Sequence, residues 1–170
     1  PRGRRSPLGQ GVALAGMRLV FFRHGIAHDR AAADCPPDPE RALTPKGIER
    51  TTLSARGLSA LGVEPALILS SPYTRALQTA RIAAHELGVR SDHLHESDAL
   101  LPEAEPKALF TLLAREKAGE ILCVGHAPNL DRVLAYAIGA GDARWTEIKK
   151  AGAARVELFV PGRAGGTLVW

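Results

Sequence analysis

Three short apolar runs constrain the fold of this chain most strongly, because a polar segment and then a helical pattern follow each one. The runs are MRLVFF (17–22), ALILS (66–70) and EILCVG (120–125). Continuous apolar runs of this length are typical of strands that are buried on both faces. Such strands alternate with helices in proteins that place a mainly parallel sheet between two helical layers. The sequence therefore predicts an α/β fold, a three-layer sandwich with a mainly parallel central sheet.

Apolar spacing, capping residues and terminal glycines predict the helices between the strands. Four are expected: 45–61 with Thr44 as N-cap, 73–87, 106–119, and one that Asn129 caps and Gly139 ends. Residues 89–104 are expected to be irregular, apart from at most a short strand. The tail segments AARVELFV (153–160) and TLVW (167–170) predict a closing β-hairpin or edge pair.

The chain of 170 residues fits a single domain, which we predict over 17–170. Residues 1–16 contain three arginines and no acid, and we expect them to be a flexible leader or sequence upstream of a natural start at Met17. An export signal is disfavoured, because the apolar stretch GVALAG is short and Arg18 interrupts its extension.

Charge and composition argue against several classes of partner. Without the three arginines of the leader, the 22 basic side chains fall to 19, against 18 acidic ones. This near balance, with only 5% aromatic residues, disfavours nucleic acid or a membrane surface as a partner. The two cysteines, Cys35 and Cys123, lie far apart in the sequence and suggest no disulfide framework, which predicts a reducing compartment, the cytoplasm.

Polar segments with arginine and histidine follow the three predicted strands. They are Arg23-His24-Gly25, SSPYTRA (70–76) and GHAPN (125–129). Parallel strands end at the same edge of a sheet, which is where open α/β sheets bind ligands. If the three strands are neighbours, His24, His126, Arg23 and Arg75 converge there.

This combination of residues favours an anion site with a nucleophile in it. Arginine forks match the oxygens of a phosphate group, and helix N-termini after residues 72 and 128 add backbone N–H donors. Cationic neighbours disfavour the charged form of a histidine and so keep a ring nitrogen free to attack. A metal is disfavoured, because Arg23 and Arg75 repel a dication and the three segments hold no carboxylate. We expect no cofactor.

Taken alone, each residue has a plainer interpretation. A single histidine after a strand is more often a hydrogen-bonded loop residue, and Arg75 alone would be a solvated charge at a helix start. We expect no role for the other histidines, which are His28, His85, His93 and His95. Lys149 or Lys150 could reach the rim of the pocket, but the default interpretation is a surface lysine pair. The joint placement of the three segments is what favours chemistry.

These motifs resemble those of the histidine phosphatase superfamily, also called the phosphoglycerate-mutase-like family. The resemblance rests on RHG, SSPYTRALQTA and VGHAPNL, in that order, and covers the chain from Met17 to about Leu158. Four further segments resemble the small SixA-type phosphohistidine phosphatase branch: RALTPKG, GHAPNL, LLPEAEP and IKKAGAARVEL. The short chain also lacks room for the insertions with which mutases of the superfamily enclose a sugar phosphate.

The resemblance implies a role for each matching residue. His24 would be the nucleophile that becomes phosphorylated, Arg23 and Arg75 would hold the phosphoryl oxygens, and His126 would donate to another oxygen. Water would then hydrolyse phospho-His24, and no metal would be needed.

The sequence departs from the family in one respect. Many members carry a glutamate proton donor about two dozen residues after the second-motif arginine, but here that region reads ESDALLPEAEP. Glu96, Asp98 and Glu103 are candidates for this role, although each is more simply a solvated loop carboxylate. A weak or absent acid fits phosphohistidine, whose imidazole leaves more easily than an alkoxide.

Four functions follow in order of preference. The first is hydrolysis of phosphohistidine in a protein, such as a histidine phosphotransfer domain. The second is hydrolysis of a small phosphate ester in the same pocket, which would need a true acid. The third is a phosphate-recognition module without turnover, and the fourth is a mutase.

Overall fold

The computed structural model describes residues 16–141 and 146–170, and six strands of this part form one sheet. Its order is β3-β2-β4-β1-β5-β6, with the following bounds: β1 Met17–Arg23, β2 Leu67–Ser70, β3 Leu94–Glu96, β4 Glu120–Gly125, β5 Ala153–Leu158 and β6 Thr167–Leu168. Neighbouring strands are parallel from β3 through β2 and β4 to β1. β5 is antiparallel to β1, and β6 is antiparallel to β5. The mainly parallel sheet and the closing antiparallel pair are confirmed.

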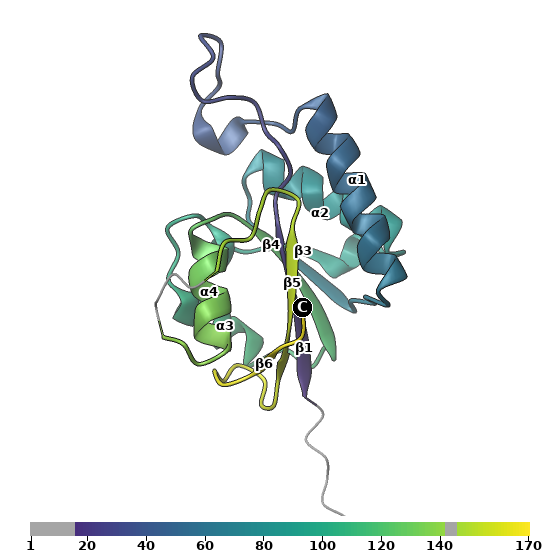
Figure 1. Cartoon of the computed structure of the whole chain (residues 1–170), viewed down its shortest axis with the longest axis vertical. Helices are drawn as coiled ribbons and strands as arrows, with labels where there is room; N and C mark the ends of the chain where they lie inside the picture. Colours follow the sequence, from purple (N-terminus) through teal and green to yellow (C-terminus); the bar gives the residue numbers. More distant parts are fainter. Residues whose placement is uncertain (1–15, 142–145) are drawn as a thin grey trace, which may run out of the picture.

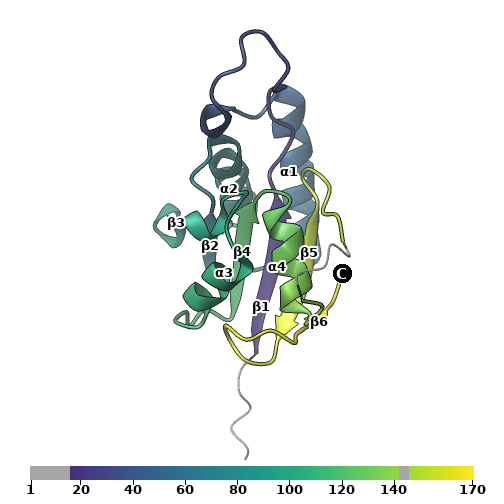
Figure 2. The ribbon, with the colours of Figure 1, turned by 90° about the vertical axis from the view of Figure 1, so that its left-hand side faces the viewer.

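Helices cover both faces of this sheet. They are α1 (Pro45–Ala60), α2 (Thr74–Glu86), α3 (Pro106–Leu113) and α4 (Asn129–Ala137). α1 and α2 lie against one face and α3 and α4 against the other (Figure 1), and Figure 2 shows the α3–α4 face toward the viewer. The predicted three-layer arrangement is therefore the observed one.

Side chains of β1 alternate between two apolar cores. Val20 and Phe22 pack on the α1–α2 side, whereas Leu19 and Phe21 pack on the α3–α4 side, and all four are fully buried. On the α1–α2 side, the small side chains of α2 (Ala76, Ala80 and Ala83) lie in the core. This alternation explains why the strand reads as a continuous apolar run rather than as alternating apolar and polar residues.

Two helix boundaries differ from the prediction. The helix expected to reach Gly119 ends at Leu113, because its buried stripe (Leu109, Phe110 and Leu113) ends there and the chain continues in turns. The N-cap of α4 is Pro128 rather than Asn129. The Asn129 amide instead donates to the carbonyl of Ala104 at 2.7 Å, which ties α4 to the segment before α3.

The start of α1 follows the prediction, since the Thr44 hydroxyl accepts from the N–H of Gly47 at 3.0 Å and Pro45 is the first helical residue. Gly47 has to be small, because a Cβ there would lie 2.0 Å from the carbonyl oxygen of Ile26. The short strand allowed within 89–104 is β3, at the sheet edge. Predictions for the leader fall almost entirely outside the described residues. Within 16–141 and 146–170, no helix has the length and apolar character to cross a membrane.

Candidate active site

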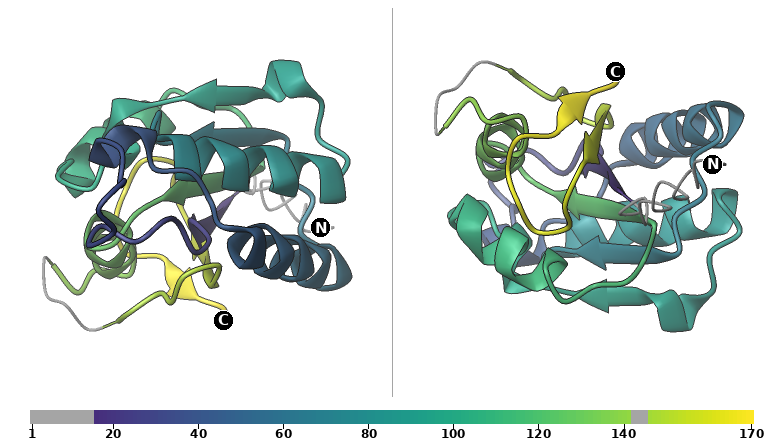
Figure 3. Two further views of the ribbon diagram at one scale, coloured as in Figure 1. Left: turned by 90° about the horizontal axis from the view of Figure 1, so that it is seen from above. Right: turned by 90° about the horizontal axis from the view of Figure 1, so that it is seen from below.

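The three polar segments meet because the strands before them end in register. Arg23 of β1 lies opposite Gly125 of β4, and Ser70 of β2 lies opposite Val124 of β4. Backbone bonds continue the ladder beyond the strands, from the N–H of His24 to Gly125 and from the N–H of Ser71 to Val124. Viewed from above in Figure 3, the loop between β1 and α1 passes over this edge. The predicted convergence at one sheet edge is observed.

His24 is held in one orientation and one tautomer. Its Nδ1 lies 2.7 Å from the carbonyl oxygen of Gly25, and because a carbonyl only accepts, Nδ1 carries the proton. Its Nε2 accepts from Nε of Arg75 at 3.2 Å, which only an unprotonated nitrogen can do. His24 as a whole residue is 7% exposed. His24 therefore presents an Nε2 lone pair at the edge of the sheet.

His126 lies beside it, with a ring-centroid separation of 4.9 Å. Its Nε2 is 2.8 Å from the hydroxyl of Ser71, whereas its Nδ1 is buried without a hydrogen-bond partner. Tyr73 packs edge-on against this ring at 5.1 Å and also lies under the guanidinium of Arg75. Both histidines and the second-motif arginine thus belong to one packed cluster.

The pKa values of the two imidazoles are strongly lowered. Burial is the main cause for His24, opposed by its bond to Gly25 and reinforced by Arg75 and Arg23, and its pKa is about 3. For His126, burial comes first and the neighbouring His24 and Arg75 follow, and its pKa is about 2. Both rings are therefore neutral at physiological pH, as a nucleophilic nitrogen requires.

Arg75 is 1% exposed, which differs from the solvated charge that an isolated arginine at a helix start would be. Besides the Nε contact with His24, its Nη1 donates to the carbonyl of Asp38 at 2.6 Å and its Nη2 to the carboxylate of Asp38 at 3.1 Å. Arg23 contributes from the end of β1. Its Nη1 donates to the carbonyl of Ile148 at 2.7 Å, and its Nε is buried without a partner.

The segment SSPYTRALQTA links all parts of the site. The Thr79 hydroxyl donates to the carbonyl of Arg75 at 2.8 Å and accepts from the N–H of Gly25 at 3.1 Å. The side-chain oxygen of Gln78 accepts from the N–H of Leu43 at 2.7 Å, next to the start of α1. Gly25 itself has no room for a side chain, since a Cβ would meet the hydroxyl of Thr51 at 2.2 Å. Because Gln78 and Thr79 both lie in α2, this helix holds the loop that carries His24 and the loop that precedes α1.

The cluster opens into a cavity of about 500 Å³. All four residues predicted from the motifs line it. The cavity has a cationic lining. One carboxylate, that of Asp29, and five positive side chains line it: Arg23, Arg30, Arg41, Arg75 and Lys150. Such a lining suits a multiply charged anion with tetrahedral oxygens.

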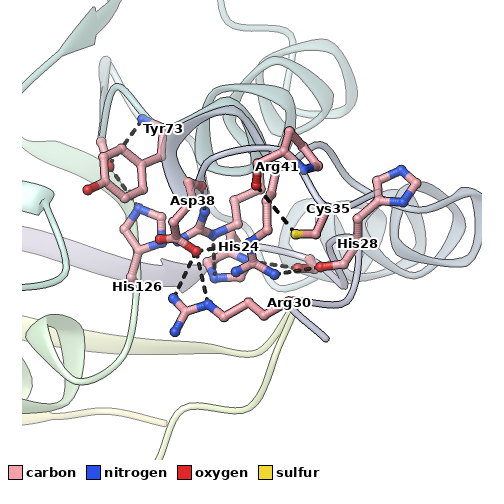
Figure 4. Close-up of polar contacts among 12 residues, drawn as sticks. His24, His28, Arg30, Cys35, Asp38, Arg41, Tyr73 and His126 are labelled. Atoms are coloured by element: carbon pink, nitrogen blue, oxygen red, sulfur yellow. Dashed lines mark hydrogen bonds and ion pairs between the residues drawn. The ribbon is translucent and has the colours of Figure 1, made fainter. Parts of the chain in front are cut away.

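Sequence reasoning missed the contribution of the loop before α1. Asp38 contacts three arginines. Its Oδ1 accepts from Arg30 and Arg41 at 2.9 Å each (Figure 4), and its Oδ2 accepts from Arg75. His28, for which no role was expected, lines the cavity, and of the two lysines weighed for the pocket rim Lys150 lines it. The only sequence signal was the cluster of charges in a Pro-rich loop, which by itself indicates a solvated segment.

The three carboxylates considered as proton donors lie elsewhere. Glu96, Asp98 and Glu103 are not part of the cavity lining, and Glu96 lines a separate groove with His85 and His95. Within the described residues, no three side chains of His, Cys, Asp or Glu are grouped closely enough to hold a metal ion. Cys123 is fully buried, which raises the pKa of its thiol to about 12, and neither cysteine forms a disulfide.

Comparison with known proteins agrees with this geometry. The model of the histidine phosphatase superfamily (branch 1) matches residues 19–101. An uncharacterized protein of Picosynechococcus sp. is 43% identical over 141 residues, which cover 80% of this chain and 82% of that protein. Phosphohistidine phosphatase SixA of Escherichia coli (strain K12) is 30% identical over 126 residues, covering 70% and 73% of the two chains. The structure of the protein histidine phosphatase SixA complexed with tungstate superimposes with a TM-score of 0.78 at 26% identity, covering 91% of this chain and 95% of that one.

Fold and site together define an α/β protein whose sheet edge carries a cationic cavity beside a neutral histidine. The chain belongs to the histidine phosphatase superfamily and, within it, resembles the SixA phosphohistidine phosphatases. It is a phosphatase, a hydrolase that acts on phosphorylated substrates.

Proposed function

We propose that this phosphatase hydrolyses phosphohistidine in a protein, through a covalent intermediate on Nε2 of His24. The observation that carries the proposal is the tautomer of His24, whose Nδ1 proton is engaged by Gly25 while the Nε2 lone pair points to Arg75. The 30% identity to a protein named phosphohistidine phosphatase supports the choice of substrate.

In the first step, the Nε2 lone pair of His24 attacks phosphorus and the P–N bond of the substrate breaks. The electron pair of that bond stays on the departing imidazole, which takes up a proton and leaves as neutral histidine. Arg23 and Arg75 hold the phosphoryl oxygens as charge shifts among them. The Nε of Arg23 has no partner and could donate directly, whereas the Nε and Nη2 of Arg75 would exchange their contacts with His24 and Asp38 for phosphoryl oxygens.

His126 supports the same step through its second ring nitrogen. The hydroxyl of Ser71 can donate to Nε2, which leaves the proton on Nδ1. This Nδ1 is buried and has no other partner, so a phosphoryl oxygen would satisfy it. A donor placed in this way stabilises the transition state without needing a charged ring.

In the second step, water attacks the phosphorus of phospho-His24 and the P–Nε2 bond breaks. The electron pair returns to Nε2, inorganic phosphate leaves, and the proton of the water passes to phosphate or solvent. The roles of metal ions in other phosphoryl transfers fall here to fixed arginines, and we propose that no metal takes part.

A histidine leaving group also agrees with the positions of the carboxylates. Glu96, Asp98 and Glu103 do not line the cavity, and protonation of a phosphoramidate nitrogen makes departure easier than for an alkoxide. An ester substrate would need one of these groups to move into the site. The small-ester function nevertheless remains the second candidate, because about 500 Å³ accommodates a small phosphorylated molecule.

The test is a panel of phosphorylated substrates at neutral pH in the presence of EDTA. We expect phosphate release from a phosphohistidine-carrying phosphotransfer domain, slower release from phosphoserine and sugar phosphates, and loss of release by a factor of at least about 10⁴ in His24→Ala. His95→Ala, at an exposed position outside the cavity, is the control. Equal rates for wild type and His24→Ala would contradict the nucleophile.

The panel also separates the alternatives. Faster turnover of an ester, reduced by Glu103→Gln or Asp98→Asn, would favour the metabolite phosphatase. Phospho-His24 trapped by an acid-free quench and detected by mass spectrometry would exclude a module that only binds phosphate.

A further inference from the structure

The negatively charged carboxylate of Asp38 contacts Arg75, the arginine that we propose binds the phosphoryl group. Its carboxylate is 3.1 Å from Nη2 of Arg75, on the same edge of the guanidinium as the Nε that contacts His24. Nε and Nη2 form one of the two edges with which arginine makes paired bonds to phosphate oxygens. A carboxylate oxygen and the ring nitrogen of His24 therefore share the two donors that a phosphoryl group needs.

A phosphoryl group bound against His24 would compete with these contacts for the guanidinium of Arg75. Attack by His24 requires phosphorus within about 3–3.5 Å of Nε2, and its oxygens then lie within about 2.7–2.9 Å of the same guanidinium edge. Asp38 holds Nη2 of that edge. Two negatively charged oxygens beside one Nη2 group repel each other, so a bound phosphoryl group weakens the contact of Asp38 with Arg75.

The loop offers Asp38 a second position without loss of its other partners. Its Oδ1 is bound by Arg30 and by Arg41, each at 2.9 Å, and the side chain is 34% exposed. Rotation of the carboxylate away from Arg75 would keep these two arginines as counter-ions. Arg75 lowers the pKa of Asp38 despite the opposing effect of its partial burial, so the group is negatively charged when a phosphoryl group arrives.

We infer that Asp38 is a resident anion that occupies one phosphoryl-oxygen position on Arg75 and is displaced when a phosphoryl group binds against His24. The inference rests on the proposed function, in that Nε2 of His24 defines where phosphorus lies. Asp38 thereby sets specificity. A free oxyanion gains only the contacts of the pocket and has to displace a carboxylate, whereas a phosphorylated protein gains contacts outside it. The pocket consequently binds inorganic phosphate, its own product, weakly.

Calorimetric titration with inorganic phosphate at neutral pH tests this inference without turnover. We expect Asp38→Asn to bind phosphate at least about tenfold more tightly than wild type, because a like charge near the anion is removed. Asp34→Asn, an equal change of charge at an exposed position of the same loop, should shift the Kd by less than about twofold. An unchanged or weaker affinity in Asp38→Asn, or no measurable binding in either protein, would overturn the inference.

A crystal structure of the wild-type protein with inorganic phosphate gives a second, independent measurement. We expect the Oδ2 of Asp38 to have left Nη2 of Arg75 and phosphate to occupy that donor. A bound phosphate with the Asp38–Arg75 contact still in place would refute the inference, even if Asp38→Asn failed to fold. Failure to trap phospho-His24 would instead refute the proposed nucleophile and leave both of these comparisons unaffected.

Discussion

Two regions build the pocket, and they are held in place in different ways. The strand-end residues (Arg23, His24, Arg75 and His126) follow β1, β2 and β4, whose register fixes the backbone on either side of them. Arg30 and Arg41 line the pocket from the loop between β1 and α1, and their side chains are joined by ion pairs with Asp38, which also pairs with Arg75.

The difference between these regions lies in how much freedom each leaves to its charges. Arg75 and both histidines are nearly inaccessible to solvent, whereas the side chain of Arg30 is 69% exposed and that of Asp38 34%. A buried group reorients only at the cost of repacking, but an exposed ion pair exchanges with water at little cost. The strand ends therefore suit chemistry that needs fixed geometry, and the loop suits a contact that opens and closes.

The same substitution, arginine to lysine, made in each of the two regions tests this difference most strongly. Arg75→Lys should lower kcat/KM by about 10²–10³, because lysine keeps the charge but loses the planar fork. Arg30→Lys should change it by less than about threefold, since Arg30 is an exposed partner of Asp38. Steady-state kinetics on a phosphohistidine substrate measures both. Similar losses in the two variants would show that the loop is as fixed as the strand ends.

A pair of glycine substitutions in α1 tests how tightly the loop packs onto the helix. Gly47→Ala should cost about 2–4 kcal/mol of unfolding free energy, because its Cβ would meet the Ile26 carbonyl oxygen at 2.0 Å. Gly57→Ala, on the same helix with open space around it, should stabilise the protein by up to about 1 kcal/mol. Urea unfolding measures both. If Gly47→Ala were neutral, the loop would be able to shift without loss of stability.

The pH dependence of stability tests whether His24 and His126 are buried as neutral rings. The folded pKa values of His24 and His126, about 3 and about 2, lie below the ordinary value of 6.5. The unfolded chain therefore binds protons that the folded protein does not, and stability falls as the pH drops below 6.5. Each imidazole contributes a slope of about 1.4 kcal/mol per pH unit.

Substitution of one histidine isolates its share of this slope. Between pH 6.5 and 5, His126→Gln should remove about half of the histidine contribution to the slope, whereas His95→Gln, at an exposed position, should remove none of it. Denaturant unfolding in buffers without phosphate or sulfate is the appropriate measurement. An identical slope in wild type and His126→Gln would mean that the His126 ring is solvated in the folded state.

Much of the fold could be predicted from local patterns. The three apolar runs became β1, β2 and β4 as parallel neighbours, and the Thr44-Pro45 start of α1 was located to the residue. The end of α3 was not, because Gly119 gave a stop signal while loss of the buried stripe after Leu113 ended the helix earlier. The position of Asn129 was also mistaken. Asparagine favours N-caps, but its amide here serves a tertiary bond to Ala104.

The sequence determined which side chains reach the sheet edge. The polar residues directly follow three parallel strands, and parallel strands end at the same edge of a sheet. A neutral histidine was predicted from its cationic neighbours, but its main cause, burial, was decided by the tertiary structure. Burial set the charge of the two imidazoles, the Gly25 carbonyl chose the tautomer of His24, and the return of a loop placed Asp38 on Arg75. Desolvation and long-range ion pairs depend on what surrounds a group in space, and no pattern of neighbours in the sequence contains that information.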